Sequence, residues 1–316
     1  MWKCLEKRMP RARRRYISRY LAYQFLCEHW HTYVSIDGAK PTRLIMGHGP
    51  WNRSFCADCF PFVHKSDLYV FYETVDAKRK GIIGCFKYNG GKWEQLGVVL
   101  ENPWHMSYPQ VFEDDGHIYM IPEQSACGKV SLYEAKIYPF KWENCADLIN
   151  RPFADATLVR KDGHYYLSCY EIPPNEKAEL WHSSSLLGPW EKHPCWNQVN
   201  QSPRLRRCGG AFFEEDGQLF RVGQDCNGDY GKRLFKVSVN MLSPSQYAEG
   251  KATLLLGRSD HSHSAGKHTY NTVMWRDKRV VCFDCKQYRL KPFGEIFSVI
   301  FRALMRFVRR KKGERE

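Results

Sequence analysis

The fold is decided by the stretch Trp104-His105-Met106-Ser107-Tyr108-Pro109-Gln110-Val111-Phe112-Glu113-Asp114-Asp115-Gly116-His117-Ile118-Tyr119-Met120-Ile121-Pro122-Glu123. Apolar and polar residues alternate on both sides of Asp115-Gly116, a strong signal for a β-hairpin. We therefore expect two strands joined by a tight turn, with the Glu123 carboxylate at the end of the second strand.

This template is repeated along the chain. Five copies fit, at 57–73, 107–123, 154–171, 209–225 and 268–284, and the last two are the faintest. Asp58, Ser107 and Asp155 stand 49 and 48 residues apart near the start of the first three copies, and the glutamates that close these copies keep a similar period. A period of this size indicates a propeller or solenoid with one supersecondary unit per repeat.

Each repeat has signals for up to four short strands, and in the first repeat the second pair is Gly81–Lys87 and Trp93–Leu100. Five units of four strands predict an all-β fold, a five-bladed β-propeller spanning residues 30–290. The last unit is too short to complete itself. We expect Trp30–Ile36 or Arg43–Met46 to supply its missing strand and close the ring.

Positive charge is concentrated at the two ends of the chain. Residues 1–20 hold eight Lys and Arg against one Glu, and residues 289–316 hold nine against three acids, out of a formal net charge of +14. A nucleic-acid-binding protein typically has a basic stripe on its folded body. The nearly neutral body therefore argues against a nucleic-acid partner, and residues 1–29 are predicted to be a basic leader.

Residues 291–316 are predicted to form a basic amphipathic helix and tail. Apolar and basic side chains share the segment, among them Phe297, Ile300, Phe301, Arg302, Arg306, Arg309 and Arg310. This pattern favours a helix lying in a membrane interface with its cations near anionic lipid. A helix docked on the propeller with solvated arginines is the alternative.

The cysteines and the start of the chain bear on localisation. Thirteen cysteines, an odd number, occur without an apolar secretory signal. Reduced thiols in a cytoplasm are favoured over a disulfide scaffold. Together with the basic end, this predicts a cytoplasmic protein that is peripheral at the inner face of the membrane.

The candidate site follows from the hairpin geometry. In an antiparallel pair, the start of the first strand and the end of the second lie at the same end of the sheet. The polar residues at these positions should therefore meet at one mouth of the propeller; they include Asp58, Ser107, Asp155, Glu123, Asp225 and His268. Carboxylates in an aromatic-rich funnel suit a ligand with many hydroxyl groups. Alternatively, the acids cap turns or pair with Lys and Arg, which we favour for Glu73, Glu171 and Asp284 taken singly.

Several segments resemble a known family. The blade starts Ala57-Asp58-Cys59-Phe60-Pro61 and Ala154-Asp155-Ala156-Thr157 look like those of glycoside hydrolase family 43 and its five-bladed relatives. A closer resemblance is to the propeller domain of the glucosamine inositolphosphorylceramide transferase family and its bacterial homologues. It rests on the segments His105-Met106-Ser107-Tyr108-Pro109, Met120-Ile121-Pro122-Glu123, Ser184-Ser185-Leu186-Leu187-Gly188-Pro189-Trp190, Gln224-Asp225-Cys226 and His268-Thr269-Tyr270.

The resemblance implies a carbohydrate-active protein related to glycosyltransferases of membrane glycolipids. In the plant enzymes a separate transferase domain follows the propeller, and we expect this chain to have no room for one. Family 43 hydrolases invert, with an Asp base in the first blade, an orienting Asp in the third and a Glu acid in the fourth. Asp58 and Asp155 match the first two roles, but Cys208-Gly209-Gly210 offers no acid, which disfavours simple hydrolysis.

We therefore expect a glycosyltransferase-like or glycan-processing role in lipid-linked or envelope polysaccharide assembly. Asp58 would be the catalytic base, and Asp155 would assist it. Sugar-binding residues would be His105, Ser107, Tyr108, Glu123, Asp225, His268, Trp51 and Trp104. The alternatives are an inverting hydrolase with a displaced acid and a non-catalytic, membrane-tethered glycan-binding module. The expected partners are a glycan or sugar donor, an anionic membrane and a possible partner glycosyltransferase; no cofactor is expected.

Two Cys-x-x-Cys pairs are a weaker feature. Cys56 and Cys59 begin the first blade, and Cys282 and Cys285 lie in the last, so ring closure would bring the pairs together. Four thiolates could bind zinc tetrahedrally. Free cysteines that fill the core are the favoured alternative, and we predict no metal.

Overall fold

The structure is a computed structural model that describes residues 25–46, 55–76, 79–257 and 264–291. Residues 1–24 of the predicted leader and residues 292–316 of the predicted C-terminal segment, with its seven membrane residues, lie outside these residues. The last four residues of the predicted leader, 26–29, are part of the strand Leu26–Ile36, so the propeller begins earlier than predicted. The chain divides into two units, Trp30–Lys286 and a unit formed by residues 1–29 and 287–316. The larger unit holds the repeats. Among the described residues, no helix has the length and apolar character needed to cross a membrane.

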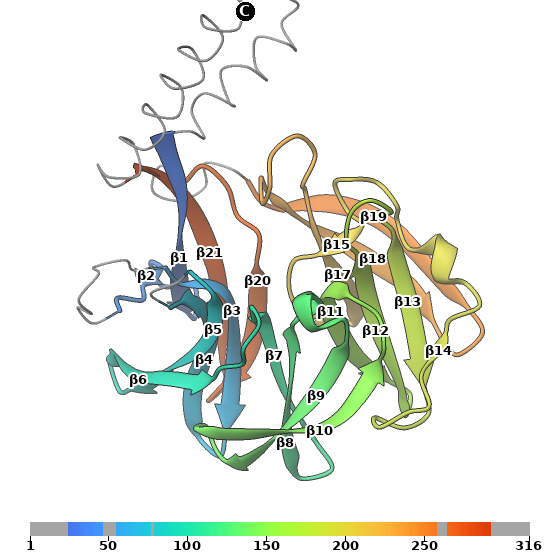
Figure 1. Ribbon diagram of the computed structural model, residues 1–316, viewed down its shortest axis with the longest axis horizontal. Coiled ribbons are helices and arrows are strands. Elements are labelled where there is room, and N and C mark those ends of the chain that lie inside the picture. The colour runs from blue at the N-terminus through green and yellow to red at the C-terminus, as the bar shows by residue number, and fades with distance from the viewer. Residues whose placement is uncertain (1–24, 47–54, 77–78, 258–263, 292–316) are drawn as a thin grey trace, which may run out of the picture. The chain divides into compact units, whose positions relative to one another are not determined.

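The larger unit consists of five antiparallel sheets arranged around a centre, as predicted (Figure 1). Blade 1 holds β3 (Ala57–His64), β4 (Asp67–Val75), β5 (Gly81–Asn89) and β6 (Lys92–Leu100). Blade 2 holds β7 (Ser107–Asp114), β8 (His117–Glu123), β9 (Val130–Ile137) and β10 (Lys141–Ile149). Blade 3 holds β11 (Phe153–Lys161), β12 (His164–Glu171), β13 (Ala178–Ser183) and β14 (Glu191–Lys192). Two short 3₁₀ turns, η1 (Ser125–Cys127) and η2 (Trp196–Gln198), lie in loops.

Blade 4 has an interrupted innermost strand. Its strands are β15 (Arg207–Cys208), β16 (Phe213–Glu215), β17 (Gln218–Gln224), β18 (Leu234–Leu242) and β19 (Tyr247–Leu256). Both β15 and β16 pair with β17, so they are two halves of one inner strand. The break falls at Gly209-Gly210, where Gly210 has a φ of +147° that few L-residues adopt.

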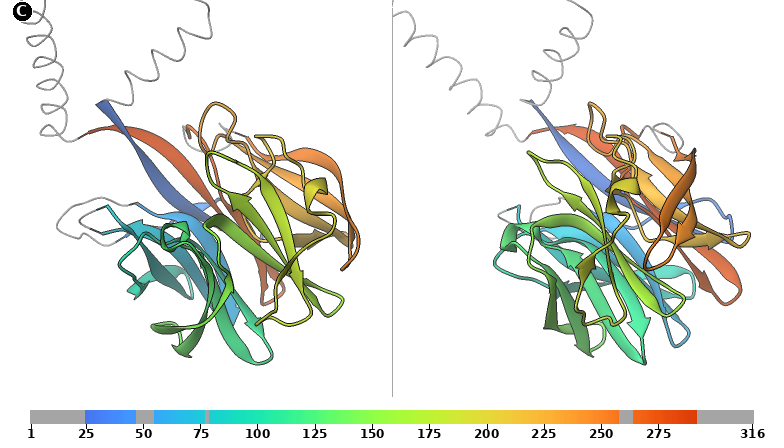
Figure 2. Two further views of the ribbon diagram at one scale, coloured as in Figure 1. Left: turned by 45° about the vertical axis from the view of Figure 1, so that its right-hand side comes forward. Right: turned by 90° about the vertical axis from the view of Figure 1, so that its right-hand side faces the viewer.

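Blade 5 is built from both ends of the repeat array. Its order is β2 (Thr42–Arg43), β1 (Leu26–Ile36), β21 (Lys278–Leu290) and β20 (Tyr270–Trp275). In both views of Figure 2 the blue β1 runs beside the red β21. The predicted closure of the ring by an N-terminal strand is therefore confirmed. Closure protects sheet edges that would otherwise be open to pairing.

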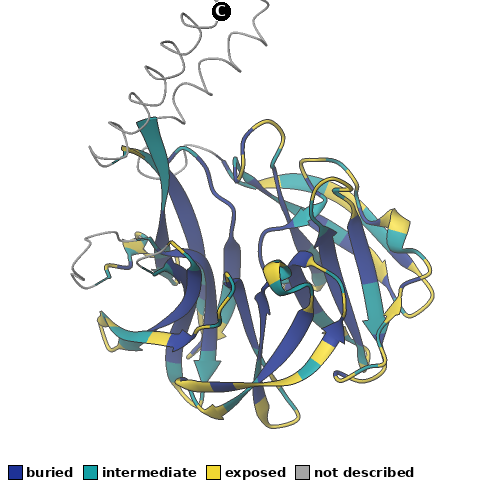
Figure 3. Ribbon diagram, in the orientation of Figure 1, coloured by how far each residue is buried: buried dark blue, intermediate teal, exposed yellow. Residues whose placement is uncertain are grey.

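Apolar clusters fill the space between neighbouring blades. Phe71 of blade 1 packs with Met120 of blade 2, and similar clusters join each following pair. Val34 and Val280 of blade 5 pack with Val70 of blade 1, which completes the circle. Figure 3 shows mainly buried residues in the inner strands and more exposed ones in outer strands such as β6 and β10. The blades therefore hold each other in register, and this positions the loops at the mouth.

Candidate functional site

A repeated backbone feature shapes the mouth, the end of the ring at which the innermost strands begin. Asp58, Tyr108 and Asp155 have φ values of 48°, 46° and 49°, in the left-handed region. Each lies at a register shift, between Ala57 and Phe60 in the first case, which marks a β-bulge. A bulge re-aims a side chain and is common beside functional sites.

The bulge corrects the alignment of the repeats. Ala57 pairs with Glu73 and Ser107 pairs with Glu123, so Ser107 is the counterpart of Ala57 and not of Asp58. The counterpart of Asp58 in blade 2 is Tyr108. The one-residue offset was hidden because the true counterparts Asp58, Tyr108 and Asp155 stand 50 and 47 residues apart, close to the 49 and 48 of the predicted alignment. The predicted meeting of strand starts and strand ends at one end of each hairpin is confirmed.

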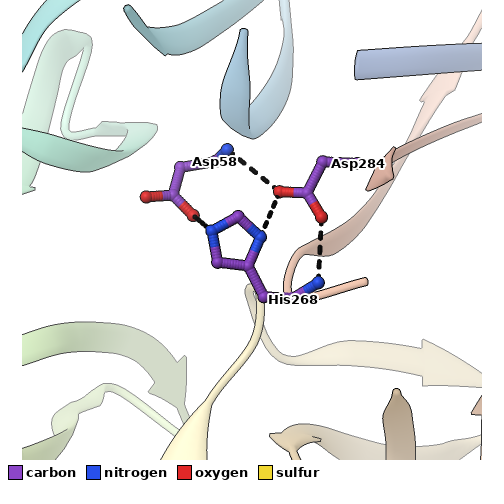
Figure 4. Close-up of side chains that lie close together, drawn as sticks. All are labelled: Asp58, His268 and Asp284. Atoms are coloured by element: carbon purple, nitrogen blue, oxygen red, sulfur yellow. Dashed lines mark hydrogen bonds and ion pairs between the residues drawn. The ribbon is translucent and has the colours of Figure 1, made fainter. Parts of the chain in front are cut away.

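Asp58 lies at the centre of the mouth and links three blades. Its Oδ1 accepts a hydrogen bond from Thr269 Oγ1 at 2.7 Å and lies 3.3 Å from His268 Nε2. Its Oδ2 accepts the backbone N–H of Tyr108 at 3.2 Å. The N–H of Asp58 donates to Asp284 Oδ2 at 3.2 Å. Figure 4 shows His268 between the two aspartates. Both carboxylate oxygens of Asp58 therefore already contact protein donors.

His268 is a buried cation. Its Nδ1 lies 2.6 Å from Asp284 Oδ2, and its ring stacks on Trp30 with centroids 3.7 Å apart. Burial by itself lowers the pKa of His268, but Asp284 and Asp58 oppose this and raise the pKa to about 9. The pKa of Asp284 is lowered below its ordinary value because the charge of His268 and hydrogen bonds outweigh the effect of burial. The imidazolium therefore neutralises part of a buried acid pair.

Ligand atoms of Asp58, His268 and Asp284 lie within 4.8 Å of one another and could in principle hold a metal ion. A metal requires a neutral imidazole nitrogen with a free lone pair. Here each ring nitrogen faces a carboxylate, and the raised pKa keeps both nitrogens protonated. The cluster fits an imidazolium bridge better than a metal centre.

Asp155, the third-blade acid, is paired with an arginine. Its Oδ2 accepts a hydrogen bond from Arg207 Nε at 2.5 Å. The guanidinium lies over the rings of Tyr230 and Tyr170, 5.1 and 5.4 Å from the centroids. Burial raises the pKa of Asp155, Arg207 lowers it, and the negative charge of Asp58 raises it further, with a net rise. Tyr108 connects the surroundings of the two acids, because its N–H donates to Asp58 and its hydroxyl contacts Thr157, two positions after Asp155.

Glu73 forms a further pair with His105. Its Oε1 lies 3.3 Å from His105 Nε2, and His105 Nδ1 accepts the N–H of Gly81 at 2.9 Å. Burial raises the pKa of Glu73 to about 7, and the charge of Asp58 adds to the rise while the His105 hydrogen bond opposes it. From the sequence, Glu73 taken singly is expected to be a structural acid. The histidine partner is in the next blade, so no local signal could have revealed the pair.

The other predicted binding residues support the mouth from within the protein. Tyr108 is 1% exposed, so its side chain cannot contact a sugar, which corrects its prediction as a sugar-binding residue. Asp225 is fully buried and held by Arg233 at 2.8 Å, and Glu123 accepts hydrogen bonds from Ser107 and Ser125. Trp104 is half-buried and donates to Gln124. Trp51 lies outside the described residues. These groups therefore position the loops. The more exposed groups at the mouth are His105, Arg207 and Tyr230.

Blade 4 has glycine in place of an acid where its innermost strand is interrupted, for a steric reason. Gly210 donates its N–H to Tyr108 Oη at 2.7 Å. A Cβ on Gly210 would lie 1.9 Å from the carbonyl oxygen of Tyr270, so no side chain fits there. The close packing of blades 4 and 5 therefore requires glycine at position 210, which explains why no acid occurs there.

The four candidate zinc ligands are divided between two clusters. Cys56, Cys59 and Cys282 pack between blades 5 and 1, whereas Cys285 packs between blades 4 and 5. Residues 282 and 285 are an odd number of positions apart on β21, and alternation along a strand turns them to opposite faces. Burial raises the pKa of Cys56 and Cys285 to about 12, so both stay neutral thiols. The geometry supports the core-filling alternative.

Comparisons with known proteins agree with the fold. A β-xylosidase superposes with a TM-score of 0.52 at 10% identity, covering 75% of this chain and 95% of that one. A thermostable family-43 glycoside hydrolase superposes with a TM-score of 0.53 at 14% identity, covering 75% and 93%. At such low identity the likeness shows the fold alone.

Sequence relatives are closer. Glucosamine inositolphosphorylceramide transferase 1 of Arabidopsis thaliana is 36% identical over 244 residues, which are 74% of this chain and 31% of that protein. The protein of the same name from Oryza sativa subsp. japonica is 36% identical over 211 residues, 64% of this chain and 28% of that protein. This chain thus matches less than a third of the length of either relative. The family model for the N-terminal region of glucosamine inositolphosphorylceramide transferase 1 matches residues 45–289. The chain therefore belongs to the glucosamine inositolphosphorylceramide transferase family.

Proposed function

We propose that the mouth of the propeller binds the glycan headgroup of a membrane lipid and that the protein takes part in glycosyl transfer to that headgroup. One observation carries this proposal: two acid–base pairs, Asp155 with Arg207 and Glu73 with His105, flank the charged centre at Asp58. The names of the sequence relatives support transfer to an inositolphosphorylceramide.

The side chains at the mouth are chemically suited to a sugar. Carboxylates accept hydrogen bonds from hydroxyl groups, and a guanidinium donates up to five. Within the described part of the chain, Arg207 uses only Nε for a protein acceptor, and its side chain is 22% exposed. Tyr230 is 38% exposed beside it and presents a ring edge or face to a ligand. Donors, acceptors and an aromatic surface therefore occur together.

Hydrolysis is the less favoured activity. An inverting hydrolase needs an acid and a base on opposite sides of the scissile bond. Gly210 occupies the fourth-blade position where a side chain would clash, so an acid would have to come from elsewhere. A non-catalytic glycan-binding module is the stronger second candidate, because the carboxylate oxygens of Asp58 are committed to protein donors.

The membrane and the partner protein complete the proposal. We propose that residues 291–316, through Phe297, Ile300, Phe301, Arg302, Arg306, Arg309 and Arg310, contact an anionic membrane surface from the cytoplasmic side. The charge and apolar pattern of the sequence supports this contact. A partner glycosyltransferase would act on the glycan that the propeller holds.

The test is a transfer assay with mass-spectrometric detection. Purified protein is incubated with inositol phosphorylceramide in detergent micelles and nucleotide-activated glucosamine, with Asp155→Asn as the comparison. A lipid product heavier by one glucosamine, lost in Asp155→Asn, supports transfer. Saturable binding without product supports the module. If the protein neither binds the lipid nor changes either substrate, the proposed function is wrong.

A further inference from the structure

We propose that Glu73, held by His105, is a carboxylate that hydrogen-bonds a sugar hydroxyl at the mouth, and that Asp58 is a structural hub that binds only protein groups. This inference rests on the proposed function, since it concerns the same site. It reverses the roles that the sequence assigned to these two acids.

The oxygen atoms of the acids decide between them. Asp58 and Asp284 each use both oxygens on protein donors. Asp225 does so as well, with Arg233 and the N–H of Asn227. Glu123 accepts from Ser107 and the N–H of Ser125. These four carboxylates have little capacity left for a ligand, because each oxygen already receives a hydrogen bond.

Glu73 and Asp155 differ from those four acids. Among the described residues, Glu73 Oε1 contacts His105, and no donor contacts Oε2. Asp155 likewise uses only Oδ2, with Arg207. Glu73 Oε2 and Asp155 Oδ1 are not among the buried polar atoms that lack a hydrogen-bond partner, so both are accessible to solvent. Water can therefore reach the remaining oxygen of each acid, and a sugar hydroxyl can replace that water as the donor.

His105 keeps Glu73 in place and connects it to solvent. The imidazole is anchored at Nδ1 by the N–H of Gly81, and 45% of its side chain is exposed. A Cβ on Gly81 would lie 2.5 Å from the His105 ring, so glycine is what allows the ring to approach. The hydrogen bond to Glu73 raises the pKa of His105 despite burial. Because Nδ1 accepts the N–H of Gly81, the proton of the ring lies on Nε2, and this N–H donates to Glu73 and orients the carboxylate.

Burial and the charges around Glu73 move its ionisation to near neutral pH. Asp58 on β3 disfavours the charged form, whereas His105 before β7 and His268 before β20 favour it. Together with burial, they place the pKa of Glu73 at about 7. A hydroxyl donates more strongly to the ionised carboxylate, so binding favours the ionised form. Affinity should therefore rise as the pH increases through about 7.

The experiment measures binding of inositol phosphorylceramide micelles and of free D-glucosamine by isothermal titration calorimetry at pH 8. Glu73→Gln removes the charge and keeps the shape. We expect it to weaken the binding of at least one probe about tenfold or more, the effect of losing a charged hydrogen bond. Glu171→Gln is the matched control, because Glu171 ends the equivalent strand of blade 3 and is held by Arg151 and Asn175. It should bind like the wild type.

A third variant separates the two roles. Asp58→Asn should lower the melting temperature, yet the folded protein should bind within about twofold of the wild type because no ligand contact is lost. The wild-type affinity should rise between about pH 6 and about pH 8, and Glu73→Gln should lose most of that rise. Wild-type binding of neither probe would refute the proposed function. Wild-type binding that Glu73→Gln leaves unchanged would refute this inference alone.

Discussion

At the scale of single residues, His268 links the charge of the mouth to the stability of the fold. The unfolded-state pKa is about 6.5 and the folded-state pKa about 9. A raised pKa means that the folded state binds the proton more tightly, so this contribution is complete below about pH 6.5 and is lost as the pH rises through about 9. Asp58 and Asp284 cause the effect because both face the imidazolium.

We expect the free energy of unfolding to fall by about 3 kcal/mol between about pH 6 and about pH 10 through this group. His268→Gln should flatten the profile in this window. Glu73 changes the free energy of unfolding at lower pH, between about 4.5 and about 7, since its pKa is raised from 4.5 to about 7. Denaturant unfolding at several pH values measures both. A profile that His268→Gln leaves unaltered above about pH 7 would contradict the imidazolium bridge.

At the scale of elements, the bulges at the starts of β3, β7 and β11 decide which side chains enter the centre. In β7 the bulge brings in Tyr108, whose Oη lies 2.9 Å from Thr157 Oγ1 and accepts the N–H of Gly210. One side chain from blade 2 therefore connects blades 3 and 4. The bulge therefore joins neighbouring blades in β7, whereas in β3 and β11 it turns an acid toward the centre.

Tyr108→Phe should lower the free energy of unfolding by about 1–3 kcal/mol, because it leaves the buried N–H of Gly210 without an acceptor. Tyr119→Phe on β8 is the control, since no hydrogen bond of its hydroxyl occurs within the described residues. Urea titrations of both variants provide the comparison. Equal stability of the two variants would show that the Tyr108 hydroxyl does not connect the blades.

At the scale of the whole ring, stability depends on β1 reaching across to β21. Val34 of β1 is 2% exposed in the cluster between blades 5 and 1, whereas its neighbour Ser35 is only partly buried. Every blade packs on two neighbours, so an opening at one junction weakens the circle as a whole.

Val34→Asp should abolish cooperative unfolding or destabilise the protein by about 3 kcal/mol or more, because it buries an unpaired charge. Ser35→Asp, on the opposite face of the same strand, should cost less than about 1 kcal/mol. Thermal unfolding followed by circular dichroism distinguishes them. Similar melting temperatures for the two variants would mean that ring closure by β1 contributes little.

The architecture of the ring could be predicted from local patterns in the chain. Asp-Gly turns, alternating strands and a constant period are local signals. They can be read from the sequence because they do not depend on how the blades pack against one another. They predicted five blades, closure by an N-terminal strand, and a mouth that Asp58 and Asp155 share. They also showed that Cys208-Gly209-Gly210 in blade 4 provides no acid.

Which of these groups a ligand can reach depends on contacts between blades, and the local patterns do not contain them. His268 reaches Asp58 from 210 positions away in the chain, and His105 reaches Glu73 from the following blade. These partners are set by how the blades pack around the ring, and no periodic pattern encodes them. The same packing buries Tyr108, occupies both oxygens of Asp58 and leaves one oxygen of Glu73 without a protein donor among the described residues. A carboxylate's function depends on its remaining hydrogen-bonding capacity, which is a property of the folded ring.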